Sequence, residues 1–133
     1  MTSKIQNFNP YPTYQIFKPF NLSLSAKAGD FLFLTGQIGA NDDGTFPEDF
    51  DNQLENVLKH LDRIIKDAGA SWEDVVQMRS FHVGDLEEQF PKILELKAKL
   101  MPKHQHAWTA LGVQQLIPKS SLIEIDLVVY VGK

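Results

Sequence analysis

An alternation of apolar and polar side chains runs through residues 122–130 and predicts a β-strand with two unlike faces. One face is apolar throughout and consists of Ile123, Ile125, Leu127 and Val129. The other face carries Glu124 and Asp126 among apolar neighbours. A carboxylate in that setting costs desolvation energy unless a partner compensates, so Glu124 is a candidate functional residue. The structural alternatives are an exposed sheet face or an ion pair across a subunit contact.

Other short runs of apolar and β-branched residues predict further strands. They lie at 14–17, 22–28, 31–35, 75–83 and in the first half of 104–130. Residues 31–35 are apolar on both faces, which predicts a central strand covered on each side. Gly36 and Gly39 follow, where the chain leaves the sheet. Glycines in this position favour a bulge or turn, and the close approach of a ligand to the backbone is the less common use.

Two segments have helical periodicity. Apolar residues recur every three or four positions over 54–68, with Asp51 or Asn52 as the expected cap and Gly69 just past the end. Ser71 and Asp74 resemble a capping box that opens a single turn. A second helix is predicted between Asp85 and Met101-Pro102. Its expected inner side consists of Phe90, Ile93, Leu94, Lys97 and Leu100.

The order of these elements predicts one α+β domain over residues 1–133, with a mixed sheet covered on one face by both helices. The second face of that sheet would then be bare, although several strands are apolar on both sides. We expect self-association into a cyclic homo-oligomer to bury it. Residues 1–13 carry Asn-Pro and Tyr-Pro-Thr and are expected to form an arm that packs late or frays.

Composition narrows the function classes. The formal net charge is −4, and Arg63 and Arg79 are the two arginines, so a nucleic-acid partner is not expected. Cysteine is absent, which excludes disulfides, thiolate metal sites and cysteine nucleophiles. Neither a signal sequence nor an apolar run of membrane-spanning length is present. We therefore expect a soluble, cytoplasmic protein with no membrane partner.

The histidines suggest one alternative chemistry. His104 and His106 have the spacing that places two imidazoles on one side of a strand, and Glu124 would complete a two-histidine, one-carboxylate metal site. Two histidines just after a helix are more commonly surface residues, so we expect no metal and no cofactor. His60 and His82 carry no predicted chemistry.

Several segments together resemble the RidA family, also called the YjgF or reactive-intermediate deaminase family. They are Ala28-Gly-Asp-Phe-Leu-Phe-Leu-Thr-Gly-Gln-Ile38, Gln53 ahead of the long helix, Asp67-Ala-Gly-Ala-Ser-Trp-Glu-Asp-Val-Val76, Asp85-Leu86, and Ile123-Glu-Ile125. The resemblance covers nearly the whole chain. It implies an α+β subunit similar to chorismate mutase, assembled as a homotrimer with ligand clefts between neighbouring subunits.

The resemblance also implies an activity, which is hydrolysis of reactive enamines and imines to 2-keto acids and ammonia without metal or cofactor. In active members an arginine within a Pro-Ala-Arg-Ser motif binds the substrate carboxylate, and a glutamate in the last strand positions or activates water. Here the motif is His106-Ala107-Trp108-Thr109, so Trp108 stands in place of the arginine. The glutamate is kept as Glu124, and the family's Ser-Gly-Gln element is Thr35-Gly36-Gln37. The family's early-strand tyrosine falls at about Leu22, and the asparagine of its second helix falls near Leu94.

Two functions follow as hypotheses. The first is a cofactor-free imine or enamine deaminase that uses Glu124 and a bound water. The second is a non-catalytic trimer that binds a small metabolite or acts as a regulator, because the carboxylate-binding arginine is missing. The expected ligand-binding residues are Leu22, Thr35, Gly36, Gln37, Trp108, Thr109 and Ala110, and the expected ligand is apolar, neutral or aromatic and stacks on Trp108. Arg79 and Lys103 are the candidates to replace the arginine. The ribonuclease label sometimes attached to this family is disfavoured by the charge.

Overall fold

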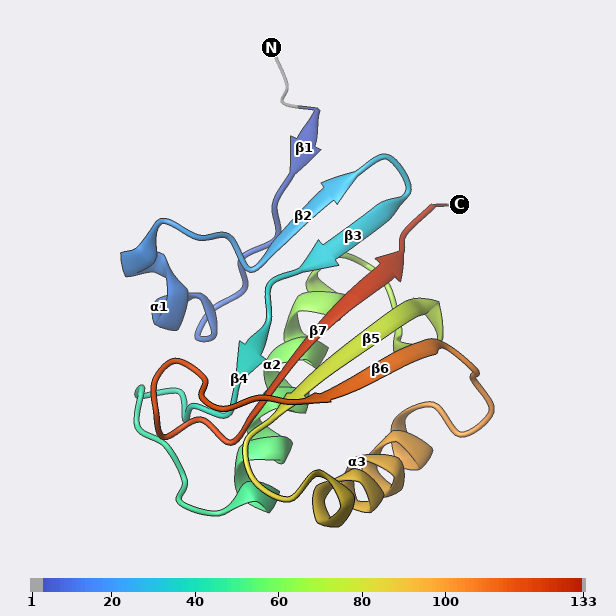
Figure 1. Ribbon diagram of the computed structural model, residues 1–133. Helices are drawn as coiled ribbons and strands as arrows, with labels where there is room; N and C mark the ends of the chain where they lie inside the picture. The colour runs from blue at the N-terminus through green and yellow to red at the C-terminus, as the bar shows by residue number, and fades with distance from the viewer. Residues whose placement is uncertain (1–3, 133) are drawn as a thin grey trace.

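The computed structural model describes residues 4–132, and their elements form one sheet with helices beside it (Figure 1). The strands are β1 (Ile5–Gln6), β2 (Ser25–Ala28), β3 (Phe31–Leu34), β4 (Gln37–Ile38), β5 (Val75–His82), β6 (Ala107–Gly112) and β7 (Ile123–Tyr130). The α-helices are α1 (Tyr14–Phe17), α2 (Phe50–Asp67) and α3 (Leu86–Leu100), and the 3-10 helices are η1 (Lys18–Phe20) and η2 (Trp72–Asp74). None of the helices within the described residues has the length and apolar character needed to cross a membrane.

The sheet is mixed. Within the described residues its strands run in the order β1-β2-β3-β7-β5-β6, and β4 pairs with β7 beyond the end of β3. β5 and β6 are parallel and connected through α3, whereas the other pairs are antiparallel. The predicted α+β fold with a mixed sheet is confirmed.

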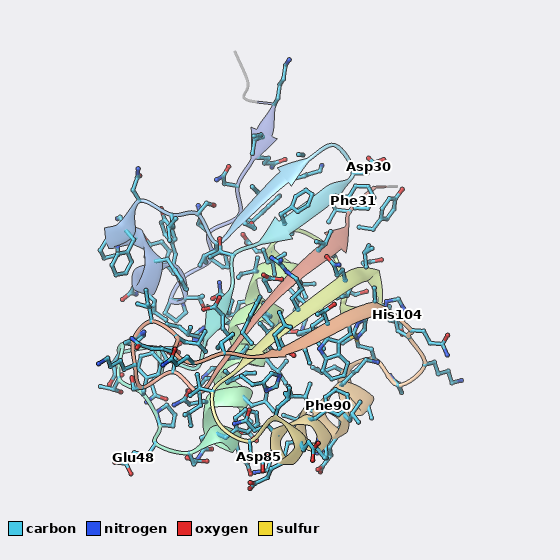
Figure 2. All side chains as sticks on the ribbon, viewed as in Figure 1. Asp30, Phe31, Glu48, Asp85, Phe90 and His104 are labelled. Carbon is cyan, nitrogen blue, oxygen red and sulfur yellow. The ribbon has the colours of Figure 1, made fainter. Side chains whose placement is uncertain are left out.

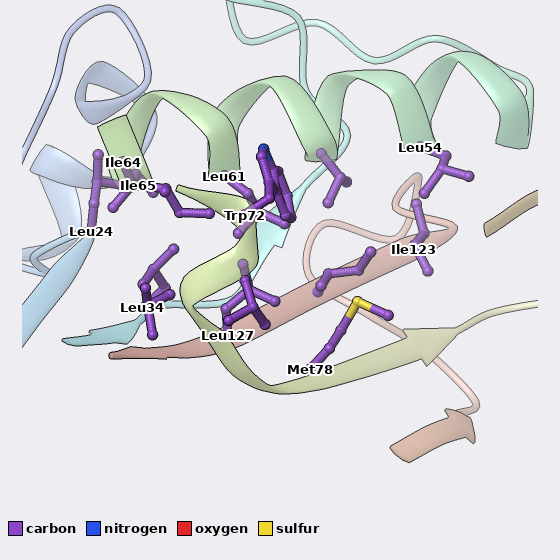
Figure 3. Packing of buried hydrophobic residues seen from close by; sticks show 14 of the residues in the cluster. Leu24, Leu34, Leu54, Leu61, Ile64, Ile65, Trp72, Met78, Ile123 and Leu127 are labelled. Atoms are coloured by element: carbon purple, nitrogen blue, oxygen red, sulfur yellow. The ribbon is translucent and has the colours of Figure 1, made fainter. Parts of the chain in front are cut away.

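α2 and α3 lie on the same side of the sheet, as predicted (Figure 1). Figure 3 shows the apolar side chains of α2 packed down onto β7 and β5. Leu54, Leu61 and Ile64 of α2 and Ile125 and Leu127 of β7 are all essentially inaccessible to solvent. This contact is the main source of hydrophobic stabilisation in the chain.

The ends of the helices agree with the sequence in part. α2 is capped by Asp49, whose carboxylate accepts a hydrogen bond from the Asn52 backbone at 3.0 Å, so the predicted caps Asp51 and Asn52 are wrong. The helix therefore begins earlier than its apolar period. Gly69 follows its end with a positive φ of 77°, as predicted. The capping box of Ser71 and Asp74 is also confirmed, and it opens η2.

α3 has its predicted cap at Asp85 but a different inner face. Gln89 and Ile93 are buried, whereas Leu94 is 44% exposed, so the expected place of Leu94 on the inner side is wrong. The buried side of α3 begins at the polar residue Gln89. Gln89 is buried because its amide hydrogen-bonds His82 and the Val83 carbonyl, and an apolar pattern could not indicate that.

The N-terminal segment differs most from expectation. Residues 14–17 form α1 rather than a strand, because four residues of alternation do not separate a strand from one helical turn. β1 pairs with β2, and the Asn9 side chain accepts the Leu24 N–H at 2.8 Å, so the described part of the arm is held rather than frayed. Residues 1–3 of that arm lie outside the described residues.

The second face of the sheet is open in the single chain. Ile123, Ile125, Leu127 and Val129 face the helices, and Glu124 and Asp126 face the open side, as the alternation predicts. β3 is paired on both edges, yet Phe31 and Phe33 are 41% and 49% exposed on the open side. The described residues of the chain do not supply the expected cover on that side of β3.

Candidate functional site

A cleft of about 780 Å³ opens beside the end of β7 where Glu124 lies. Its walls come from α1 and η1, from the β3–β4 connection, from residues 40–46 and from the loop before β7. Most of the lining is apolar, and its larger side chains are Ile16, Phe17, Phe20, Leu22, Phe46 and Ile117. Glu124 is the one charged residue in the lining among the residues that the structure describes. The cleft is therefore an apolar pocket with a single carboxylate.

Glu124 is surrounded by apolar groups and backbone. It lies directly opposite Phe81 of β5 and Ile38 of β4 in the sheet register. A Cβ atom on Gly36 would lie 2.8 Å from the Glu124 Cδ and 2.9 Å from its Cγ, closer than atoms pack. The glycine at position 36 is thus required by the close approach of the Glu124 side chain, which neither interpretation of this glycine had anticipated.

The Glu124 carboxylate has no hydrogen bond or ion pair to any residue in 4–132. Its pKa is raised by burial, and the nearby Asp126 carboxylate raises it further. A half-buried carboxylate with a raised pKa and no structural partner is able to exchange protons with a bound molecule.

Asp126, by contrast, is satisfied by Arg79. The Arg79 Nε and Nη2 atoms donate to its two carboxylate oxygens at 3.0 and 2.7 Å, directly across from β5 to β7. This bidentate pair also raises the pKa of Arg79. Arg79 is engaged, and neither it nor the exposed Lys103 lines the cleft, so neither replaces the family arginine within the subunit.

Trp108 lies on the helix side of the sheet, away from Glu124. Its ring stacks on Phe90 of α3 at 4.7 Å between centroids, and Figure 2 shows Phe90 on α3 beside β6. Its Nε1 donates to Ser80 Oγ at 3.0 Å, and Ser80 in turn bonds His82 Nε2 at 2.8 Å. His82 Nδ1 bonds Gln89 Oε1 at 2.8 Å. This chain of hydrogen bonds ties β6 to β5 and α3.

The protonation of that network follows from its partners. The amide oxygen of Gln89 accepts, so His82 carries its proton on Nδ1 and accepts from Ser80 at Nε2. Burial lowers the pKa of His82, which keeps the ring neutral. Trp108 and Glu124 therefore lie on opposite sides of the sheet within one subunit, and a cleft between subunits that brings them together stays a prediction.

The structure thus divides the predicted site residues. Leu22, Thr35, Gly36 and Glu124 line the cleft together. Gln37, Trp108, Thr109 and Ala110 do not. Gln37 is fully buried and pairs in register with Ile125, which faces the helices, while its amide nitrogen donates to the Thr35 carbonyl at 3.0 Å. Thr109 shares the open face with Arg79, and Ala110 shares the helix side with Ser80.

The aromatic wall was missed by sequence reasoning. Phe17 lies on α1, where a strand was predicted. Phe20 lies on η1, outside the predicted elements, and Phe46 lies in a polar loop. One available signal was the spacing of three between Phe17 and Phe20, which places both on one side of a helical turn.

A buried histidine holds this wall in place. His60 of α2 bonds Thr13 Oγ1 at Nδ1 and the Ala40 carbonyl at Nε2, both at 2.7 Å. Thr13 also accepts from Arg63, which forms a bidentate pair with Asp42. Burial lowers the pKa of His60, so the ring is neutral with its proton on Nε2. Thr13 immediately precedes α1, so this network fixes one side of the cleft.

Gln53 fixes the opposite side. It lies in the first turn of α2 rather than ahead of the helix, and it is fully buried. Its amide nitrogen donates to the Pro47 and Ser120 carbonyls, and its oxygen accepts the Leu122 N–H, each at 2.8 Å. The loop that carries Ile117 into the cleft is therefore attached to α2.

The three residues of the alternative metal site do not come together in the structure. His104 Nε2 bonds the Val75 carbonyl at 2.6 Å, and His106 Nδ1 bonds the Ala107 carbonyl at 2.9 Å. Among residues 4–132, no three His, Cys, Asp or Glu side chains come together as a metal site would require. His104 and His106 belong to the entry of β6, and Glu124 lies at the cleft instead.

Known proteins share both the sequence and the fold. The family model described as Endoribonuclease L-PSP matches residues 16–131. RutC family protein YjgH of Escherichia coli (strain K12) is 32% identical over 108 residues, which are 80% of this chain and 82% of that protein. The solved structure of Protein YJGH has a TM-score of 0.86 to this chain at 27% identity, and the match covers 98% of this chain and 99% of that one.

A longer protein is similar over much of this chain. The chloroplastic Reactive Intermediate Deaminase A of Arabidopsis thaliana is 32% identical over 108 residues, which are 80% of this chain and 56% of that longer protein. Because the family model spans most of the chain and these relatives agree with it, the chain belongs to the Endoribonuclease L-PSP family, the RidA or YjgF family that its motifs indicate.

Proposed function

We propose that the protein is a cofactor-free hydrolase of imines or enamines, in which Glu124 activates the attacking water. The observation that carries the proposal is the half-buried Glu124 carboxylate, which lacks a partner among the described residues and lies in an apolar cleft. A carboxyl group whose pKa is raised toward neutrality accepts and returns protons more effectively near neutral pH. The name of the Arabidopsis relative, a reactive intermediate deaminase, agrees with this chemistry.

The reaction needs one group that moves protons in both directions. The Glu124 carboxylate takes a proton from water while the water oxygen bonds to the carbon of a protonated imine, which gives a carbinolamine. Glu124 then returns the proton to the nitrogen. The C–N bond breaks as the C=O bond forms, and the hydroxyl proton passes through Glu124 to the released amine. The products are a carbonyl compound and an ammonium ion, and the carboxylate is regenerated.

The assembly belongs to the same proposal. Phe31, Phe33 and Tyr130 are exposed side by side on the open sheet face, and a homotrimer would bury them. The clefts would then lie at the contacts between subunits. A ligand contact from Trp108, Thr109 or Ala110 would require β6 of a neighbouring subunit at the cleft, and stays a prediction. The cytoplasmic location stays a prediction as well.

The proposal is tested by the release of amine from freshly formed imines. Glu124→Gln keeps the shape of the side chain and removes the base, so kcat/KM should fall by about a hundredfold or more. Glu55→Gln, the same change on the exposed side of α2, is the matched control and should leave the rate unchanged. Equal rates for the wild type and Glu124→Gln would exclude Glu124 as the catalytic residue.

A second candidate function is supported by the lack of any cation in the cleft lining among the described residues. A trimer that binds a small metabolite without converting it needs no group to hold a substrate carboxylate. This function would be favoured if the wild type hydrolyses no imine faster than buffer. Nuclease activity, which the family description names, is disfavoured because the net charge is −4 and the described cleft offers no basic side chain to a phosphate.

A further inference from the structure

The cleft has an unusual charge balance for a site that would handle amino-acid derivatives. Among the described residues its lining contains one carboxylate and no Lys, Arg or His. Lys18 and Lys119 are next in sequence to lining residues, but neither belongs to the lining. Arg79 lies on the same sheet face as Glu124, and its Nε and Nη2 atoms both donate to Asp126. The cleft therefore has a net negative charge whenever Glu124 is ionised.

The Glu124 side chain is also in close contact with the backbone. Gly36 lies against it, and Phe81 and Ile38 lie opposite Glu124 in the sheet register. The rest of the cleft offers aromatic rings, from Phe17, Phe20 and Phe46. Aromatic faces attract organic cations and pack against apolar bodies.

We propose that the cleft selects ligands that have a protonated nitrogen on an apolar, ring-sized body and that lack a carboxylate. The nitrogen pairs with Glu124, and the body packs among the phenylalanines. This inference rests on the proposed function in that it takes the Glu124 cleft as the ligand site. It narrows the substrates to imines that carry no carboxylate, whose protonated C=N group is itself the required cation. 2-Imino acids are then not expected to be substrates.

The preference follows from whether the ligand brings a charge that compensates the ionised Glu124. An ammonium or iminium group supplies the opposite charge that the half-buried Glu124 lacks, so the two desolvated charges offset one another. A ligand carboxylate would be a second negative charge in the same apolar cavity, and the described lining has no cation to pair with it. A neutral ligand of equal size gains only the apolar contacts.

The test uses three ligands that share one ring and differ in charge: benzylamine, benzyl alcohol and benzoate. Isothermal titration of the full chain at neutral pH should give a Kd for benzylamine at least about tenfold lower than for either of the others. In Glu124→Gln this preference should vanish, because the amide carries no charge. In the Glu55→Gln control it should be unchanged.

Two results would overturn the inference: benzoate binding as tightly as benzylamine, or no detectable benzylamine binding at millimolar concentration. Both are measured on the wild type, so they do not depend on the folding of a variant. A protein that hydrolyses imines through Glu124 but binds benzoate as tightly as benzylamine contradicts this inference alone. Binding of benzylamine through Glu124 without any hydrolysis contradicts the proposed function alone.

Discussion

Glu124 lowers the stability of the fold that carries it. Its pKa is raised by burial, so the charged form is less favourable in the folded chain than in the unfolded one. The destabilisation is absent below the unfolded pKa, where the group is neutral in both states. It develops as the pH rises from the unfolded pKa to the folded pKa, because only the unfolded chain ionises in that range, and it is complete above the folded pKa. A carboxylate kept at such a position is typical of a functional site.

The first prediction follows from this destabilisation by the ionised carboxylate. Glu124→Gln should raise the Tm by a few degrees at neutral pH, because the uncompensated charge is gone, and the gain should shrink toward zero by about pH 4. Calorimetry of both proteins at the two pH values measures it. An equal or lower Tm for the variant at neutral pH would mean that Glu124 is compensated in solution by a group that the single chain does not supply.

The second prediction concerns Gly36. An added methyl group would overlap the Glu124 side chain, so Gly36→Ala should displace the carboxylate and destabilise the fold by about 1–3 kcal/mol. Ligand affinity and the rate of imine hydrolysis should both fall. Gly112→Ala is the matched control, because a Cβ at Gly112 meets no atom within 4 Å. If the two variants behave alike in titration and in the assay, the contact between Gly36 and Glu124 is not needed.

Among the helices and strands, those with a regular apolar period were predictable, and those positioned by buried polar side chains were not. The alternation in β7 correctly separated Ile125 from Glu124, and the helical period found α2, because burial of one face dictates both patterns. α1 was missed because four residues of alternation do not distinguish a strand from one helical turn. The hydrogen bond that holds its start, from Thr13 to His60, joins residues 47 positions apart and is not visible in a local pattern. The inner face of α3 was predicted wrongly because a hydrogen bond also decides it: Gln89 is buried through its bond to His82.

The candidate site was predictable only in part. Glu124 was found because a carboxylate within an apolar strand is conspicuous in a sequence, whereas Gly36 was assigned to the site from the family resemblance. Trp108 was assigned to the cleft from its place in the motif, but the parallel pairing of β5 and β6 puts it on the same side as Met78, toward the helices. Which face of an edge strand meets a ligand depends on register, and register with a distant strand is not visible in the local pattern.

The third prediction tests the position of Trp108 on the helix side of the sheet. Trp108→Phe keeps a ring against Phe90 but removes the donor to Ser80, so the free energy of unfolding should fall by about 1–3 kcal/mol. Benzylamine affinity should stay within about twofold of the wild type, because Trp108 lies on the other side of the sheet from Glu124. Denaturant unfolding and titration measure the two effects. A clear loss of affinity with unchanged stability would place β6 of a neighbouring subunit at the cleft.

For the whole molecule, the open sheet face is the surface that the proposed trimer would bury. Phe33 lies in the middle of that face, in register with Val128, and Leu94 is comparably exposed on α3. Light scattering should give about 45 kDa, three times the 15.1 kDa of the chain. Phe33→Lys should shift the mass to that of the monomer, and Leu94→Lys should not. A wild-type mass near 15.1 kDa would contradict the proposed trimer.

Among the described residues Glu124 is an uncompensated carboxylate, and we propose that it is available to a bound ligand. A pH titration of the Glu124 side-chain carboxyl by carbon-detected NMR tests this proposal, with Glu124→Gln used to assign the signal. The pKa should lie above the ordinary value of a glutamate in the free protein, because the group is buried beside Asp126, and it should fall when benzylamine is added. A pKa at or below the ordinary value in the free protein, unchanged by benzylamine, would contradict the account.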